Sequence, residues 1–267
     1  MMKQKTPHKY FILLVFLFLS CSFSASKRKI AKAEELVSQK KYQEAILLYE
    51  EVAKNHSQTK QAHLAYYRTA SIYHWFLHDF EKAVVFYKKY VEVVGNFKKM
   101  MTAQKALANL IHYKLGKYDE AIIEYQKILD SNPPYEEGLK FHLEIADCYF
   151  SSRAYSQARA EYFKVLGFLK DPVATEKIHY HIATSYYLEG LYGGAVREFN
   201  KYTALYPDGT YHQEALINIA KSYESQDDMI KALDAYQRVL KEDPRMNLVQ
   251  MKVEYLRKRL LAKGLKQ

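Results

Sequence analysis

An alanine flanked by two aromatic residues returns along this chain at an almost constant interval. The intervals between successive alanines are 38, 38, 37, 37 and 37 residues. An aromatic residue, or Met229 in the last copy, stands three residues before each alanine, and another aromatic residue stands four residues after it. The alanines are Ala45, Ala83, Ala121, Ala158, Ala195 and Ala232. A period of this length predicts a stack of identical units, none of which can bury its apolar face alone.

Steps of three and four residues place the flanking rings and the alanine on one face of a helix. We predict a second helix before each of these helices, because the residues that stand twelve positions before the alanines are mostly small. These residues are Ala33, Ser71, Asn109, Ala146, Ala183 and Ala220. The turns between the two helices are predicted at Lys40, His78, Gly116, Arg153, Gly190 and Asp227. The chain is therefore predicted to be all-α, with six helix-turn-helix units.

Three segments in this register resemble the second helix of a tetratricopeptide repeat: "GKYDEAIIEYQKILDSNP", "GLYGGAVREFNKYTALYP" and "DDMIKALDAYQRVLKEDP". The resemblance covers residues 26–244 and implies a right-handed α-solenoid of six units. The period exceeds the usual repeat of about 34 residues. The extra residues fall in linkers such as "YPDGTYHQEA", and this spacing is similar to that of envelope repeat lipoproteins of the outer-membrane-assembly BamD type.

Residues 1–20 are predicted to be a signal peptide. Three lysines precede an unbroken apolar run of nine residues, Phe11 to Leu19, which is too short to span a bilayer as a helix. Ser20, Cys21 and Ser22 resemble a bacterial lipoprotein cleavage box, with Phe18 at the place where leucine is usual. We predict cleavage before Cys21 and lipidation of its thiol. The alternative is ordinary cleavage after Ser24 or Ser26, which would release a soluble protein.

The chain has two cysteines. Lipidation of Cys21 would leave Cys148 alone, and no intramolecular disulfide could then form. Cys148 falls inside a predicted first helix, so we expect a small buried apolar residue there.

The formal charge of +10 is unevenly distributed. Residues 245–267 contain seven basic residues against Glu254, whereas residues 21–244 have a net charge of +1. Residues 245–267 are therefore predicted to form a basic helix that caps the stack. Its predicted apolar set is Leu248, Met251, Tyr255, Leu256 and Leu260. Its basic back could face solvent, anionic lipid headgroups or an acidic partner. We predict no binding of nucleic acid.

The family resemblance implies that the first helices line an inner surface on which segments of partner proteins bind. One position of these helices carries four aromatic residues in succession, and basic residues lie at neighbouring positions. We predict a partner-binding groove formed by Trp75, Tyr113, Phe150, Tyr180 and Tyr187 together with Arg68, Lys140 and Lys177. The partner would present an apolar or aromatic segment flanked by acids. The alternative is that several of these rings pack against neighbouring helices.

Patterns for catalysis are not found in the sequence. It has no glycine-rich phosphate loop and no zincin-type histidine pair, so neither a catalytic residue, a cofactor nor a metal is predicted. His142 and His179 share a register and could stack between neighbouring units. The predicted function is a non-enzymatic scaffold in the bacterial cell envelope, lipid-anchored at a membrane, most simply the outer one, and facing the periplasm. Outer-membrane protein assembly is one candidate role. The alternative function is a soluble periplasmic protein that binds peptides or regulates an enzyme.

Overall fold

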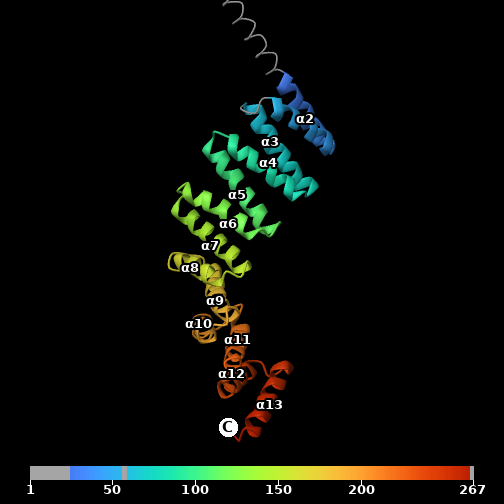
Figure 1. Ribbon diagram of the computed structural model, residues 1–267. Coiled ribbons are helices and arrows are strands. Elements are labelled where there is room, and N and C mark those ends of the chain that lie inside the picture. Colours follow the sequence, from blue (N-terminus) through green and yellow to red (C-terminus); the bar gives the residue numbers. More distant parts are fainter. Residues whose placement is uncertain (1–24, 56–58, 265–267) are drawn as a thin grey trace, which may run out of the picture. The chain divides into compact units, whose positions relative to one another are not determined.

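The computed structural model describes residues 25–55 and 59–264, and every regular element in that part of the chain is a helix. The first helix covers residues 25–38. The later elements, shown in Figure 1, are α2 (Tyr42–Asn55), α3 (Lys60–Ile72), the π-helix η1 (Tyr73–Leu77), α4 (Phe80–Val93), α5 (Phe97–Tyr113), α6 (Tyr118–Asp130), α7 (Tyr135–Ser151), α8 (Tyr155–Leu166), α9 (Pro172–Leu188), α10 (Tyr192–Leu205), α11 (His212–Ser225), α12 (Met229–Glu242) and α13 (Asn247–Ala262).

The chain divides into two compact units, the first ending at Ile128 and the second beginning at Leu129. In the first unit α2 packs on α3, α3 on α4 and α4 on α5; in the second, each helix from α7 to α13 packs on the next. Packing of successive helices in chain order is the arrangement of an α-solenoid, so the predicted fold class is confirmed. We number the helix pairs repeat 1 (residues 25–38 and α2) to repeat 6 (α11 and α12).

The predicted alanine seam is the buried centre of these helix pairs. All six alanines of the periodic pattern have no exposed surface, and the aromatic residue four positions after each is buried as well. An alanine at this place leaves room for the neighbouring helix to approach, and the ring fills the space beside it. These aromatic residues are Tyr49, Tyr87, Tyr125, Tyr162, Phe199 and Tyr236.

The turn inside each repeat also lies where the sequence predicts it. All six predicted turn residues, from Lys40 to Asp227, have a positive φ, between 52° and 79°. In repeats 4 and 5 the next residue closes the turn: the Ala154 N–H donates to the Tyr149 carbonyl at 2.8 Å, and the Leu191 N–H donates to the Tyr186 carbonyl at 2.9 Å. This hydrogen bond, five residues back, is that of a Schellman motif. Gly190 takes the left-handed conformation without the steric cost of a side chain.

Repeats 2 and 3 have turns that are one residue wider. The closing N–H of Asp79 donates to the Tyr73 carbonyl, six residues back, and the N–H of Lys117 donates to the Ile111 carbonyl in the same way. In repeat 2 the additional residue is accommodated by η1, since a π-helix holds one more residue per turn than an α-helix. The first helices are consequently shifted by one position relative to the prediction.

This shift corrects two members of the predicted small-residue column. Ala70 and Ala108 are the fully buried residues in repeats 2 and 3, whereas Ser71 is half-buried and Asn109 is exposed. Counting back twelve residues from the alanine gave the wrong residue, because the distance in these two repeats is thirteen. The other predicted members, Ala33, Ala146, Ala183 and Ala220, are fully buried.

The C-terminal helix α13 packs on α12, but it buries a different face from the one predicted. Val249, Val253, Leu256 and Leu260 join the core of the second unit. Of the predicted apolar set only Leu256 and Leu260 are buried; Leu248, Met251 and Tyr255 are 79%, 66% and 50% exposed. Valines spaced four residues apart, together with the two leucines, form the continuous buried stripe, so the prediction of the other three residues was wrong.

Cys148 is fully buried in α7, as predicted, and its burial raises the pKa of the thiol to about 12. Within residues 25–55 and 59–264, none of the helices has the length and hydropathy needed to cross a bilayer. Residues 1–20 and Cys21 lie outside the described residues, so the signal peptide and the lipidation site stay predictions.

Candidate functional site

The predicted groove residues of the first unit are all exposed. Trp75 and Tyr113 are 64% and 59% exposed, each at the end of a first helix. Arg68 is exposed on α3, and its Nε donates to Glu34 Oε1 at 2.8 Å. The structure therefore presents two large rings on the surface of this unit, while the arginine is engaged in an ion pair between repeats 1 and 2.

The aromatic residues predicted for the second unit are held by its core. Phe150 and Tyr187 are half-buried, and their rings contact those of Tyr155 and Tyr192 edge to face. Tyr180 is 7% exposed and stacks on Tyr211 with ring centroids 4.4 Å apart. The prediction that Tyr180 lines a groove is wrong, because the ring is part of the core between α9 and the elements that follow.

The two lysines predicted for the second unit differ in their surroundings. Lys140 is exposed on α7. Lys177 is half-buried on α9, and its Nζ donates to Asp147 Oδ2 at 3.0 Å. Lys177 is thus committed to an ion pair between repeats 4 and 5.

Asp147 is the centre of a polar network that the sequence analysis missed. The Tyr162 hydroxyl donates to Asp147 Oδ1 at 2.6 Å and lies 2.9 Å from His181 Nδ1. Burial alone would raise the pKa of Asp147, but hydrogen bonds from His181 and Tyr162 and the nearby Lys177 ammonium lower it to about 2. Both carboxylate oxygens have partners, so the network ties three helices together and offers no free base for catalysis.

A ring stack crosses from α7 to α9 beside this network. Phe150 and His181 lie face to face, with centroids 4.8 Å apart and an interplanar angle of 17°. The stack considered for His142 and His179 does not form: His142 Nδ1 lies 2.8 Å from Glu161 Oε2, and the His179 ring packs on Tyr206. Repeats 4 and 5 are instead joined by the stack of Phe150, eight residues after His142, on His181, two residues after His179.

The wide turns of repeats 2 and 3 create a feature that is repeated within the first unit. In each of them a histidine is followed directly by the exposed aromatic residue, and the two rings stack. The centroids are 3.9 Å apart in His74–Trp75 and 4.0 Å apart in His112–Tyr113, with interplanar angles of 15° and 18°. Because the turn holds one more residue, the histidine keeps the place that Phe150 and Tyr187 have in repeats 4 and 5, and the extra aromatic residue projects outward.

Each histidine is fixed from behind by the second helix of its own repeat. His74 Nδ1 lies 3.5 Å from the Tyr87 hydroxyl, and His112 Nδ1 lies 3.3 Å from the Tyr125 hydroxyl. The rings of Phe80 and Tyr118, at equivalent positions of α4 and α6, contact these histidines edge-on. A ring held on two sides forms a rigid support for the exposed ring stacked on it.

A further aromatic stack extends this surface to repeat 1. Phe76, which is 51% exposed, stacks on Tyr42 with centroids 4.8 Å apart. We call Tyr42, Trp75, Phe76 and Tyr113 the aromatic edge. Phe76 and both histidines were not among the predicted groove residues. The interval of 38 instead of 37 residues, together with the dipeptides His-Trp and His-Tyr at equal positions, was a signal for them.

The unit that carries the aromatic edge is basic. Residues 25–128 contain 18 lysines and arginines against 11 acidic residues, a net charge of +7. Lys114 Nζ lies 5.8 Å from the centroid of the Phe80 ring, beside His74. Burial, and then the charges of Lys114 and His78, lower the pKa of His74, so this histidine is neutral at pH 7. The aromatic edge therefore belongs to a unit that combines exposed apolar rings with a net positive charge.

Comparison with known proteins identifies the repeats. Residues 103–167 and 214–245 match two models described as tetratricopeptide repeat. These segments are therefore tetratricopeptide repeats, in agreement with the helix pairs of the fold. No curated protein sequence matches it. Within the described residues, groups of histidine, cysteine and acidic side chains that could hold a metal ion are not found.

Solved structures share the fold at low sequence identity. The structure of Naa15/Naa10 bound to HypK-THB gives a TM-score of 0.72 at 14% identity, covering 94% of this chain and 35% of that one. MamA gives 0.52 at 14% identity over 70% of this chain and 94% of that one. YrrB, described as a tetratricopeptide repeat protein with an unusual peptide-binding site, gives 0.50 at 16% identity over 79% and 97%.

Proposed function

We propose that this protein is a non-enzymatic scaffold of the bacterial cell envelope that holds a segment of another protein on its aromatic edge. Tetratricopeptide repeats are generally suited to protein–protein interaction, and residues 103–167 and 214–245 match such repeats. The finer part of the proposal is that the protein is exported, is anchored by a lipid on Cys21 and faces the periplasm from the outer membrane. Outer-membrane protein assembly is the role we put first, because the linker spacing is similar to that of the BamD type.

One observation supports the binding site above the others: an exposed aromatic ring stacked on a histidine occurs at the same position in two successive repeats. Trp75 and Tyr113 are more than half exposed although each is stacked and supported. Rings that are already ordered in the free protein lose little conformational entropy when a ligand covers their exposed faces. Two such rings in adjacent repeats favour a ligand that extends along the unit, as a peptide segment does.

The charge of the first unit specifies the ligand further. A net charge of +7 over residues 25–128 favours a segment that carries aspartate or glutamate beside its apolar residues. Peptide binding is also described for YrrB, which has the same fold. The aromatic edge supplies contact area, and the basic surroundings would supply long-range attraction and orientation.

Crosslinking in living cells tests the proposed site. A photo-reactive phenylalanine analogue at Tyr113 should capture a defined protein, which mass spectrometry then identifies. The same analogue at Phe97, which is 60% exposed at the other end of α5, is the matched control. Alanine at both Trp75 and Tyr113 should weaken recovery of that partner at least about tenfold, since each aromatic contact at a hot spot contributes more than about 1 kcal/mol. Equal capture from Phe97, or full binding by the double variant, would reject the site.

Radiolabelled palmitate tests the anchor separately. Label should appear in the membrane fraction and disappear when Cys21 is replaced by alanine. Label that persists in Cys21→Ala would refute lipidation at this residue, and an unlabelled, soluble periplasmic product would establish the alternative of ordinary signal cleavage. Neither result affects the crosslinking experiment, so the anchor and the binding site can fail independently.

A further inference from the structure

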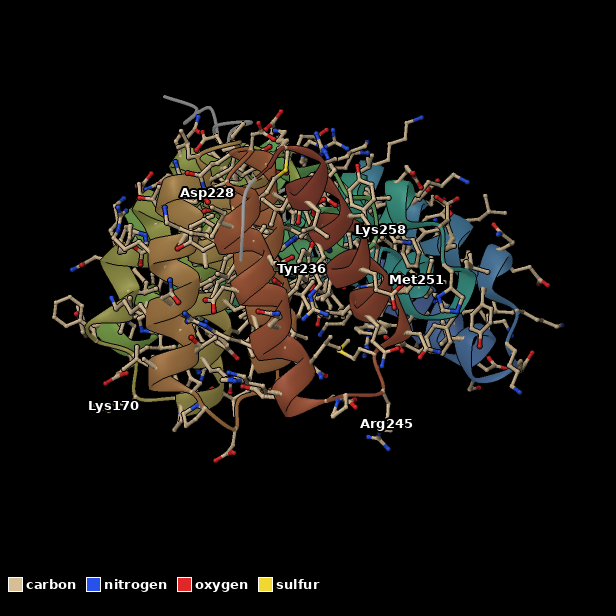
Figure 2. The ribbon with its side chains drawn as sticks, turned by 90° about the horizontal axis from the view of Figure 1, so that it is seen from below. Lys170, Asp228, Tyr236, Arg245, Met251 and Lys258 are labelled. Atoms are coloured by element: carbon tan, nitrogen blue, oxygen red, sulfur yellow. The ribbon has the colours of Figure 1, made fainter. Side chains whose placement is uncertain are left out.

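The C-terminal helix carries an apolar stripe on the side that faces away from the core. Leu248, Met251 and Tyr255 occupy positions i, i+3 and i+7, which lie on one face of a helix. They are 79%, 66% and 50% exposed, while the opposite stripe from Val249 to Leu260 is packed on the second unit. Figure 2 shows Met251 and Lys258 on this helix, next to α12 with Tyr236. Helix α13 is thus apolar on two faces, and only one of them has a partner within its unit.

Cations border the exposed stripe along its length. Lys252 and Arg259 are seven residues apart and form the row beside Leu248 and Tyr255; Lys252 Nζ and Arg259 Cζ each lie 5.9 Å from the centroid of the Tyr255 ring. Lys258 lies seven residues after Met251, on the other side of the stripe. Lys252 also pairs with Glu224 at 2.5 Å. Among the described residues, no ion pair involves Arg257, Lys258 or Arg259.

The charge of α13 contrasts with that of the helices on which it packs. Residues 129–244 contain 12 basic and 18 acidic residues, a net charge of −6, whereas residues 245–264 contain six basic residues and Glu254, a net charge of +5. Positive charge in this otherwise acidic unit is therefore concentrated in α13 and the residues that flank it. A second copy of the same stripe is a poor occupant, since the rows of Lys252 and Arg259 would face each other.

We propose that this stripe docks α13 on the surface of a bilayer that contains anionic lipids. Leu248 and Met251 would enter the boundary between headgroups and acyl chains, and Tyr255 would lie at headgroup level, where its ring is apolar and its hydroxyl stays hydrated. Lys258 and Arg259 have long stems that allow the charge to reach lipid phosphates while the helix lies flat, whereas Lys252 is held by Glu224. This surface is independent of the lipid anchor and of the aromatic edge.

Vesicle binding tests the proposal with the full chain carrying Cys21→Ala. Trp75→Phe together with Tyr255→Trp places the single tryptophan in the stripe. Its emission should move to shorter wavelength with vesicles of phosphatidylcholine and phosphatidylglycerol, and not with phosphatidylcholine alone. The apolar run near the N-terminus is the same in all variants, so only differences between variants and between lipids are interpreted. Equal binding to both kinds of vesicle would overturn the proposal.

Matched variants separate the stripe from other parts of the chain. Lys258→Glu with Arg259→Glu should weaken binding to the anionic vesicles at least about tenfold, because each basic residue near such a surface contributes measurably. Lys201→Glu with Lys221→Glu makes the same change in net charge away from the stripe and should have little effect. Leu248→Ser with Met251→Ser should also lower binding, whereas Leu261→Ser, on another exposed side of α13, should not. Normal vesicle binding by the stripe variants would contradict the proposal. If the parent protein were instead a dimer and these variants were monomeric, the stripe would be a dimer interface.

Discussion

His112 and Tyr113 are consecutive in the chain, yet their rings lie face to face with centroids 4.0 Å apart, and His74 and Trp75 repeat this relationship 38 residues earlier. Consecutive residues of a regular α-helix point about 100° apart, so their rings do not normally stack. The wide turns after α3 and α5 make the stack possible. The additional residue therefore has no role in burying the seam, and this makes it the first place to look for function.

Deletion of Trp75 should leave the fold intact. It shortens the distance between Ala70 and Ala83 from thirteen to twelve residues, the value in repeats 4 to 6, where a Schellman motif closes the turn. We expect the free energy of unfolding, measured by urea denaturation with circular dichroism, to change by less than about 1 kcal/mol. Trp75→Ala, which keeps the wide turn, is the control. A loss of several kcal/mol in the deletion variant alone would mean that the wide turn is required for folding.

Ala158→Leu should destabilise the second unit. Ala158 has no exposed surface, so three more heavy atoms must displace the neighbouring helix, at a cost of about 1–3 kcal/mol. Ala160→Leu on the same helix is the matched control, because residue 160 is exposed and its substitution should change stability by less than about 0.5 kcal/mol. Equal denaturation midpoints for the two variants would contradict the close packing of the alanine seam.

Asp147 should make stability depend on pH in the acid range. Its pKa falls from an ordinary 3.8 to about 2 in the folded protein, so its contribution is fully present above pH 4 and is lost as the pH falls toward 2. Asp147→Asn should lower the free energy of unfolding by about 2 kcal/mol at pH 6, with a smaller difference from the parent near pH 2. Urea titrations across this range, with Asp208→Asn as an exposed control, measure the difference. A constant difference at all pH values would contradict the ion-pair network.

Val253 and Met251 should differ in how far the same substitution lowers stability. Val253 is 4% exposed and packs in the core of the second unit, so Val253→Ser should cost about 2–3 kcal/mol through a cavity and a buried hydroxyl. Met251→Ser should stay within about 0.5 kcal/mol, because residue 251 is 66% exposed. Thermal melts followed by circular dichroism compare the two variants. If Met251→Ser were the more destabilising of the two, the buried face of α13 would be the one that the sequence predicted.

The residues that the sequence predicted well are those that every repeat must share. The alanine seam and the six turn residues recur because each unit buries the same face and reverses the chain at the same place, so six copies of the signal reinforce one another. The surface of a repeat is not constrained in this way. Tyr180 was assigned to a groove by its position in the repeat, but Tyr211, in the linker after α10, stacks on it. The linkers are where the repeats differ.

The spacing of small and aromatic residues was sufficient to predict the class of fold, the number of helix pairs and the places where each pair turns. Which aromatic residues reach the surface depends instead on how the helices pack. A shift of one residue rotates a helical side chain by about 100°. One more residue in a turn, as at Trp75 and Tyr113, is therefore enough to exchange a buried ring for an exposed one. A buried stripe that is offset by one position, as in α13, has the same effect. The pattern of hydrophobic residues alone does not fix so small a difference.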